Sequence, residues 1–208
     1  MDYQVGAMGS SHVLPERTSD IIARVARENQ SNMVTVGELL DALKDRSFGV
    51  IIIFFALPNV IVPISWVLGT PILLLTVQMV MGRQTPWLPE FMKRQEISGD
   101  TFAKIASYVV TYLAKIEKWL KPRWGFLTTN TMERFIGLYL TFLTIVLLVP
   151  IPFGNALPAF GIAIVAAGLI EKDGMAIVVG SLIGLAGTLY IVLLVGGIWT
   201  AIKAIFGF

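Results

Sequence analysis

The decisive stretch of this sequence is Val149-Pro150-Ile151-Pro152-Phe153-Gly154-Asn155-Ala156-Leu157-Pro158, which interrupts an apolar run from Phe135 to Ile170. That run contains no Asp, Glu, Lys or Arg, as a hydrocarbon solvent requires. Proline inside a helix removes a backbone donor and clashes with the preceding turn, so the sequence predicts two apolar arms joined by a bend. As helices, the arms 135–148 and 159–170 would rise about 21 and 18 Å, less than the roughly 30 Å of a bilayer core.

An earlier run repeats this order of features. It extends from Gly49 to Met81 and is broken by Pro58, Pro63 and Pro71, with Asn59 in its bend. We therefore predict two proline-broken helical hairpins, over residues 49–82 and 135–170. Paired interrupted helices in transporters often mark an inverted repeat. The alternative is that proline bends recur by chance in apolar hairpins.

Composition places the chain in a membrane. Of its 208 residues, 55% are hydrophobic and 14% are charged, and the mean hydropathy is +0.75, so the apolar share exceeds that of a typical soluble domain. The unbroken apolar run 175–195 has the length of a full transmembrane helix. We predict an all-α, polytopic α-helical membrane protein, with a disordered tail or expression remnant at 1–17 and a single helical membrane domain at 18–208.

Polar helices flank the apolar segments. Thr35 and Glu38 have the spacing of a capping box. Residues 98–121 repeat apolar side chains at helical spacing opposite Lys104, Lys115 and Lys118. This helix suits the membrane interface, and packing against the rest of the protein is an equal alternative.

Lys and Arg set the expected topology. They gather before the first hairpin and between the two hairpins, whereas both bends have none, so both flanks and the N-terminus are predicted to be cytoplasmic. Each hairpin is then either re-entrant or a pair of short crossings. The last helix carries the C-terminus outward unless the segment after Gly197 turns back.

Several motifs together resemble those of one known family. They are the segments 37–49, Ala56-Leu57-Pro58-Asn59, 78–83, Pro86-Trp87-Leu88-Pro89, Lys121-Pro122-Arg123, 150–158 and Glu171-Lys172-Asp173-Gly174. They resemble the ExoD family of bacterial exopolysaccharide-synthesis membrane proteins over residues 18 to 195. The resemblance implies a bacterial inner-membrane protein connected with making or exporting exopolysaccharide, in a family whose molecular activity is not well defined.

The two bends are the main candidate sites. Asn59 and Asn155 bring amides into apolar surroundings, and nearby prolines free carbonyls that something polar must satisfy. The alternative is that each Asn caps its own turn. The substrate-binding or pathway candidates are Asn59, Asn155, Pro58, Pro63, Pro152, Pro158 and Gly154, with Gln78 and Arg83 as weaker ones; Gln78 bonding a neighbouring helix and Arg83 reaching the interface are their alternatives.

Two further patterns have competing interpretations. The acidic stripe Glu38, Asp41 and Asp45 precedes the first hairpin and would bind a cation or deliver a proton, although a solvated helix face is the favoured interpretation. Gly180, Gly184 and Gly187 form a stripe of small residues that allows close helix approach. This stripe would serve a homodimer or internal packing, and we favour the dimer.

Some classes of protein are disfavoured by what is missing. The chain has no Cys, no P-loop, no Gly-x-Gly-x-x-Gly after a strand and no His–Glu zinc motif. We therefore expect no enzyme, no metal, no cofactor and no nucleic-acid partner, and instead membrane lipids, a second copy and exopolysaccharide-synthesis proteins as partners. A transporter-like role is the first hypothesis, a scaffold that recruits polysaccharide-synthesis enzymes the second, and a small intramembrane enzyme a weaker third.

Overall fold

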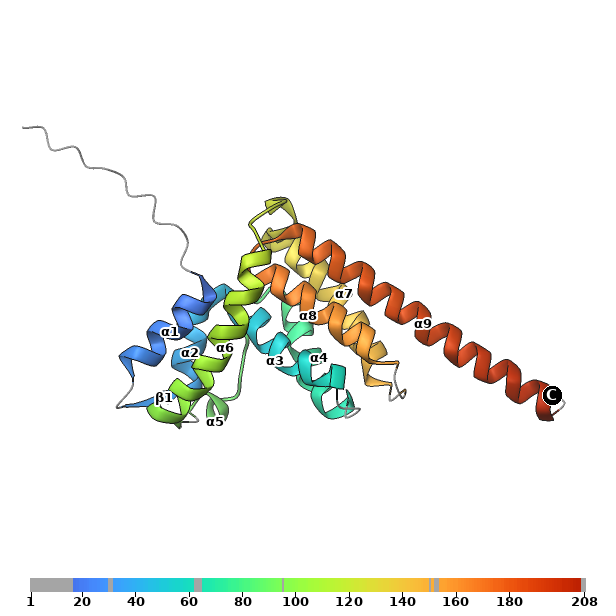
Figure 1. Ribbon diagram of the computed structural model, residues 1–208, viewed down its shortest axis with the longest axis horizontal. Helices are drawn as coiled ribbons and strands as arrows, with labels where there is room; N and C mark the ends of the chain where they lie inside the picture. Colours follow the sequence, from blue (N-terminus) through green and yellow to red (C-terminus); the bar gives the residue numbers. More distant parts are fainter. Residues whose placement is uncertain are drawn as a thin grey trace, which may run out of the picture.

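The fold is all-α apart from two three-residue strands. The computed structural model describes residues 17–29, 32–61, 65–94, 96–149, 151 and 154–206 (Figure 1). The elements are α1 (Thr18–Glu28), β1 (Met33–Thr35), α2 (Val36–Leu43), η1 (Lys44–Arg46), α3 (Ser47–Ile61), α4 (Ser65–Val80), α5 (Glu90–Lys93), β2 (Glu96–Ser98), α6 (Gly99–Trp119), η2 (Gly125–Thr128), α7 (Asn130–Leu148), α8 (Ala156–Ile170) and α9 (Gly174–Phe206). The strands, which we did not predict, pair antiparallel with Val34 opposite Ile97. The predicted tail, apart from Arg17, lies outside the described residues.

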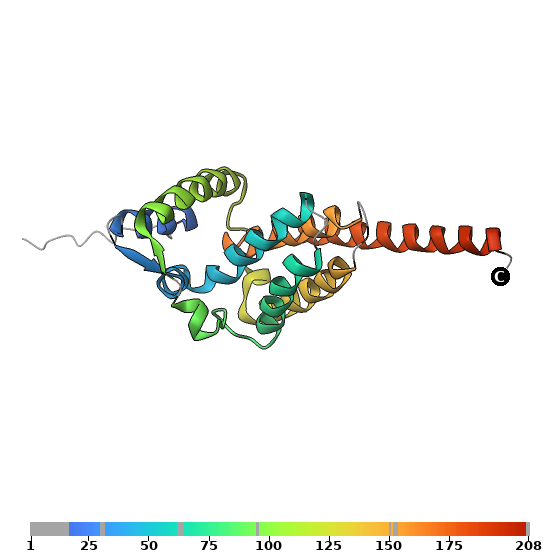
Figure 2. The same cartoon turned by 90° about the horizontal axis from the view of Figure 1, so that it is seen from below.

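The elements form two groups with separate cores. The hairpin bundle consists of α3, α4, α7 and α8, with α9 packed on α8, and the N-terminal layer consists of α1, α2 and α6 (Figures 1 and 2). Side chains such as Ile52, Ile72, Leu140 and Ile162 make the bundle core. A second cluster, including Ile22, Val34 and Phe102, makes the core of the N-terminal layer. By length and composition, α7 and α9 are the two described helices that qualify as candidate membrane spans.

The two predicted hairpins are present, as α3–α4 and α7–α8. The start of α3 lies against the end of α8, since a methyl group on Gly49 would be 2.9 Å from the carbonyl oxygen of Ala166. The start of α4 likewise meets the end of α7, where such a group on Gly69 would be 3.0 Å from Leu148 Cδ2. Both bends therefore lie at one end of the bundle.

The expected inverted relation between the hairpins is not the one observed. Because each hairpin begins and ends away from the bends, α3 and α7 run in the same direction. If the hairpins are a repeat, their symmetry axis lies along the helices, which makes the repeat parallel rather than inverted. The predicted placement of both flanks on the same side of a membrane implies the same arrangement.

The first bend begins later than the prolines suggested. The helix α3 continues through Pro58 to Ile61, although the missing N–H of this proline leaves the carbonyl of Phe54 without its helical donor. The disruption is tolerated because the helix ends one turn later. In the second hairpin, α8 includes Pro158 in its first turn, where helical N–H groups have no intrahelical partner to lose.

The last helix is longer than the predicted 175–195 segment. It continues through Gly196 and Gly197 to Phe206, 33 residues in all, or about 50 Å. Its C-terminal part extends beyond the bundle (Figure 1). The chain therefore does not turn back between Gly197 and Phe206, the last described residue.

The predicted interfacial helix 98–121 is α6, and it packs within the protein. Phe102 and Ala106 are buried in the core of the N-terminal layer, against α1. Packing is thus the alternative that the fold supports for these two side chains.

The glycine stripe on α9 lies against α8 and α7 of the same chain. A methyl group on Gly180 would be 2.7 Å from the backbone nitrogen of Val165, and one on Gly187 would be 2.6 Å from Pro158 Cδ. Gly184 is close to Leu143 and to Gly161. The structure therefore supports the internal-packing interpretation, and the stripe is not a free surface for a dimer.

Closing this contact with one methyl group should destabilise the protein. In Gly161→Ala the new Cβ would lie 2.7 Å from Gly184 Cα, and such overpacking against backbone costs about 1–3 kcal/mol. Gly197→Ala is the matched control, because nothing lies within 4 Å of its Cβ position, and it should be neutral or stabilise by up to about 1 kcal/mol. Thermal unfolding in detergent measures both, and equal effects would contradict the close contact.

Candidate functional site

Asn59 lies in the last turn of α3 and is buried, with 3% of its surface exposed. Its Nδ2 donates a 3.1 Å hydrogen bond to the carbonyl of Phe55, one turn earlier. Its Oδ1 is buried and has no donor among the described residues. Leaving a buried acceptor unsatisfied costs about 1–3 kcal/mol, so a ligand that donates a hydrogen bond to this oxygen at the first bend would be stabilised.

Asn155 has a structural role at the second bend. Its Nδ2 donates 3.0 Å hydrogen bonds to the carbonyls of Leu147 and Val149 at the end of α7. Because Asn155 directly precedes α8, its side chain connects the two arms of the hairpin. The amide nitrogen thus binds the last carbonyls of α7, and the Asn155 side chain makes no capping hydrogen bond to α8.

The remaining residues predicted at the two bends lie partly within helices and partly outside the described residues. Pro58 and Pro158 lie within α3 and α8, and Pro63 and Pro152 lie outside the described residues. Gly154 is buried between its own turn and α9, since a methyl group there would be 2.8 Å from Ile151 Cγ2 and 3.3 Å from Ile191 Cγ1.

Gln78 and Arg83 lie at the opposite end of the bundle. The amide of Gln78 pairs with the backbone of Trp87, accepting at 2.6 Å and donating at 3.3 Å. It thereby holds the segment after α4 in place, rather than bonding a neighbouring helix. Arg83 is exposed and lines a cavity of about 120 Å³ together with Asp45 and Glu133.

The acidic stripe does not act as one group. Glu38 is taken up by the predicted capping box, accepting from the Thr35 N–H at 2.9 Å while Thr35 Oγ1 accepts from the Glu38 N–H at 3.1 Å. Asp41 is exposed, whereas Asp45 lines the cavity beside Arg83. In the described part of the chain, no group of three or more His, Cys, Asp or Glu side chains is placed to hold a metal ion.

A much larger cavity, of about 950 Å³, separates the N-terminal layer from the end of α8. We call it the basic cleft because seven of its lining residues are Lys or Arg and three are acidic. The basic residues are Arg17, Arg24, Lys44, Arg46, Lys118, Lys121 and Lys172, and the acidic ones are Asp45, Glu117 and Glu171. Its positive residues therefore come from α1, η1, α6, the segment after α6 and the α8–α9 turn.

Two of the acids in the basic cleft are bound by the start of α1. Buried Glu117 of α6 accepts hydrogen bonds from the N–H of Ser19 at 2.9 Å and from its Oγ at 2.5 Å. Thr18 Oγ1 donates to Glu171 at 3.3 Å and accepts from Arg46 at 2.9 Å. The bonds of Glu117 join α6 to α1 within the N-terminal layer, and the Thr18–Glu171 bond connects that layer to the α8–α9 turn. Burial and the charge of Glu117 raise the pKa of Glu171, against the opposing effects of Arg46, Thr18 and Arg17.

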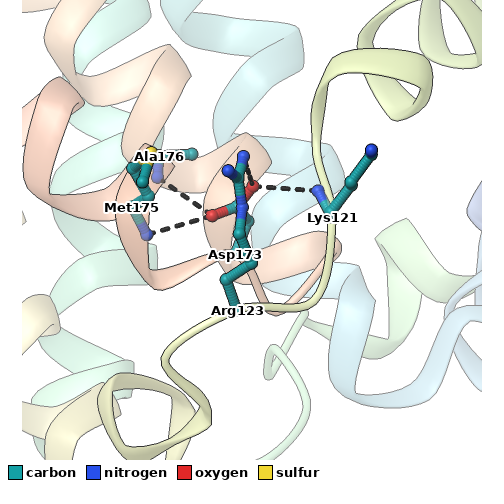
Figure 3. Close-up of polar contacts among 5 residues, drawn as sticks. All are labelled: Lys121, Arg123, Asp173, Met175 and Ala176. Carbon is teal, nitrogen blue, oxygen red and sulfur yellow. Dashed lines mark hydrogen bonds and ion pairs between the residues drawn. The ribbon is translucent and has the colours of Figure 1, made fainter.

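Asp173, in the α8–α9 turn, accepts four hydrogen bonds at the junction between this turn and the segment after α6 (Figure 3). Its Oδ1 accepts from the N–H groups of Met175 and Ala176, at 3.0 and 3.3 Å, and so caps α9. Its Oδ2 accepts from the Lys121 N–H at 2.9 Å and from Arg123 Nη2 at 3.1 Å. In Figure 3 the side chain of Lys121 points away from the carboxylate. Burial opposes its charge, but these hydrogen bonds outweigh burial and lower the pKa of Asp173.

This junction is not among the sites predicted from the sequence, where Glu171-Lys172-Asp173-Gly174 and Lys121-Pro122-Arg123 appear only as motifs of the family resemblance. The structure brings the two motifs together. Arg123 and Asp173 form an isolated parallel β-bridge, and the Gly174 N–H donates a 2.8 Å hydrogen bond to the Arg123 carbonyl. The sequence signal for this contact is that each motif carries charges of one or both signs and comes shortly before an apolar helix, α7 or α9.

Replacing Asp173 by Ala should destabilise the protein by about 2–4 kcal/mol, because it removes a helix cap and charge-assisted hydrogen bonds together. The folded pKa is lowered, so the contribution is fully present above the unfolded value of about 3.9 and is lost as pH falls through the folded value. Melting of wild type and variant from pH 7 to pH 3 measures it. Asp41→Ala, at an exposed position, is the control; a difference that grows below pH 4 would contradict this role.

Comparison with known proteins agrees with the motif resemblance. The family described as "Exopolysaccharide synthesis, ExoD" matches residues 18–193. The chain is 28% identical to Protein ExoD of Rhizobium meliloti (strain 1021) over 184 residues, which cover 85% of this chain and 76% of that protein. It is also 28% identical to an uncharacterized Synechocystis protein, over 72% of this chain and 73% of that one. No solved structure matches the chain.

Proposed function

The chain belongs to the ExoD family, and from that premise we propose that it is a non-enzymatic inner-membrane protein that moves a lipid-linked saccharide during exopolysaccharide synthesis. In this proposal the hairpin bundle and α9 lie in the bilayer, and the N-terminal layer lies in the cytoplasm. The observation that carries the transporter-like role is the buried, undonated Oδ1 of Asn59 at a hairpin bend.

The outer surface of the bundle supports its placement in lipid. Large apolar side chains are exposed on each of its helices and on α9, among them Phe54, Leu74, Phe142, Phe160, Leu182 and Leu189. A monomeric soluble protein rarely exposes so large an apolar surface. Charged residues gather in the N-terminal layer and at the end of the bundle beside it, which fits the cytoplasmic side.

Distances along α9 indicate how deep the second bend would lie in the bilayer. Trp199 lies about 38 Å along α9 from Gly174, and the Lys203 ammonium is 5.5 Å from its ring, a pair suited to the far membrane interface. Gly154 of the second bend contacts α9 at Ile191, about 12 Å before Trp199. This level lies inside the apolar layer and supports re-entrant hairpins.

An unsatisfied polar group at that depth in the bilayer is energetically costly. No water is available in the hydrocarbon to donate a hydrogen bond to the Asn59 oxygen. Polar side chains inside membranes often mark substrate pathways. Both bends lie at the same end of the bundle, so a passing polar head group would meet the two in one region. The head group's hydroxyl donors would satisfy the Asn59 acceptor.

A scaffold is the second candidate, favoured by a different observation. The N-terminal layer has its own core, and α6 presents exposed Lys104 together with Trp119, which is 84% exposed. Aromatic residues are enriched in protein interfaces. A scaffold would use this surface to recruit polysaccharide-synthesis enzymes.

Transport and scaffolding can be separated with Asn59→Leu, which removes the polar group at the bend. In proteoliposomes carrying a fluorescent polyprenyl-diphosphate sugar, we expect wild type to expose the label to an external quencher. Asn59→Leu should slow the exposure of the label to the quencher by about tenfold or more, because the transport barrier rises by about the free energy of one hydrogen bond between neutral groups. The unfolding temperature of this variant should be unchanged or higher. Thr144→Val is the control, since its buried hydroxyl is satisfied by Leu140 in its own helix.

Transport by Asn59→Leu at the wild-type rate would remove the bend from the pathway. Absence of transport by wild type, with loss of polymer in cells after Lys104→Glu, would replace the transporter with the scaffold.

Sidedness can be tested directly because the chain has no Cys. With an impermeant maleimide on intact cells, Ala204→Cys at the end of α9 should be labelled, whereas Ser107→Cys on α6 should be labelled only in inverted vesicles. Val149→Cys, at the second bend, should resist both treatments because re-entrant hairpins do not emerge. Labelling of Val149→Cys from outside would show crossing hairpins instead.

A further inference from the structure

We propose that the basic cleft is a binding site for a phosphate or diphosphate group, held by Lys44 and Lys172. This inference deepens the proposed function by assigning the head group of the ligand to the cytoplasmic end of the molecule. It rests on that function only for the location of the cleft beside the bilayer. The phosphate chemistry follows from the residues of the cleft.

The backbone at these two lysines is the first observation. Lys44 has φ 48° and ψ −122°, and Lys172 has φ 53°. Both angles fall where glycine is strongly preferred and an L side chain is strained. Three described non-glycine residues have positive φ, and these two line the same cleft. A glycine would relieve the strain at each position, so the lysine side chain supplies something that glycine does not.

The charge balance of the basic cleft is the second observation. Of its three acids, Glu117 and Glu171 are already hydrogen-bonded, to Ser19 and Thr18. Asp45 is exposed, and Glu133 outside the cleft interacts electrostatically with Lys172, so seven basic residues face three acids in the cleft. The side chains of Lys44, Lys118, Lys121 and Lys172 are exposed, and none of them forms an ion pair with a residue in the described ranges. An excess of positive charge in a concave site raises the local concentration of anions.

The size and the charge of the basic cleft suit a ligand that bears a phosphate or diphosphate. The two lysines come from different walls, Lys44 from the end of α2 in the N-terminal layer and Lys172 from the α8–α9 turn. A cavity of about 950 Å³ has the size of a small-molecule site, larger than an inorganic anion requires. A phosphate or diphosphate carries enough oxygens to accept from both walls at once, and the remaining volume admits the sugar that it bears.

Another explanation is that each lysine only complements a helix C-terminus. Lys44 follows α2 and Lys172 follows α8, where a positive charge interacts favourably with the helix dipole. In that case replacing the charge would lower stability and leave affinity unchanged. The two explanations therefore differ in which measurement changes.

The experiment uses the full chain, purified in detergent at about 150 mM salt to screen loose surface attraction. Calorimetric titration with inorganic pyrophosphate and, separately, with decyl phosphate measures binding to wild type, Lys44→Gln, Lys172→Gln and the double variant. We expect each single substitution to weaken binding by about tenfold, the loss of one charge-assisted contact. Lys104→Gln removes the same charge from α6 outside the basic cleft and should change affinity less than about twofold.

Glycine substitutions add a readout that a structural role would not produce. Lys44→Gly and Lys172→Gly relieve the backbone strain, so they should raise the unfolding temperature while weakening binding as the Gln variants do. Lower stability with unchanged affinity would overturn the proposal in favour of the helix-dipole role.

The two probes distinguish the source of the phosphate. Binding of both supports a site that also accepts water-soluble phosphorylated sugars, and binding of decyl phosphate alone supports a lipid-borne head group. Binding of neither, or equal binding by wild type and the double variant, would overturn the proposal. Because pyrophosphate binding in detergent requires neither a bilayer nor transport, failure here is separable from failure of the proposed function.

Discussion

The Asp173 carboxylate is the interaction on which the arrangement of the two groups of helices depends. It caps α9 and at the same time holds the backbone of Lys121 and the guanidinium of Arg123. That segment follows α6 directly, and Glu117 of α6 in turn holds the start of α1. Burying a carboxylate is unfavourable unless hydrogen bonds replace its water. Asp173 obtains two of its four hydrogen bonds, those from Lys121 and Arg123, only when the segment after α6 lies beside the start of α9. This contact therefore helps to hold the N-terminal layer beside the bundle.

A second constraint sets the geometry within the hairpin bundle and α9. Gly161, Gly180 and Gly184 let the backbones of α8 and α9 approach more closely than any side chain would allow. This contact fixes α8 along α9, and with it the level of the second bend. Since α3 lies against α8 and α4 against α7, the first bend follows to the same end. The two hairpin bends and the basic cleft are thus at opposite ends of one bundle.

Much of the fold was predictable because its signals are local. Charge-free runs and prolines gave both hairpins, apolar length gave α9, and the spacing of Thr35 and Glu38 gave the capping box. The boundaries were less predictable: helix α3 passes Pro58, since a proline removes one helical hydrogen bond without necessarily ending the helix. Of the candidate site, the sequence placed Asn59 and Asn155 at the bends but did not separate their roles, because hydrogen-bond partners such as the Leu147 carbonyl depend on how the arms meet.

The sequence by itself determined that this protein is all-α, that its apolar helices come in two proline-broken pairs, and that it belongs with the exopolysaccharide-synthesis family. Those properties depend on composition, periodicity and motifs, which are read along the chain. Only the tertiary structure decided that the hairpins run in the same direction, that the glycine stripe packs internally, and that Lys44 and Lys172 share a cleft. These outcomes depend on contacts between residues far apart in sequence, such as Asp173 with Lys121, and no local pattern encodes which distant partner a buried group will find.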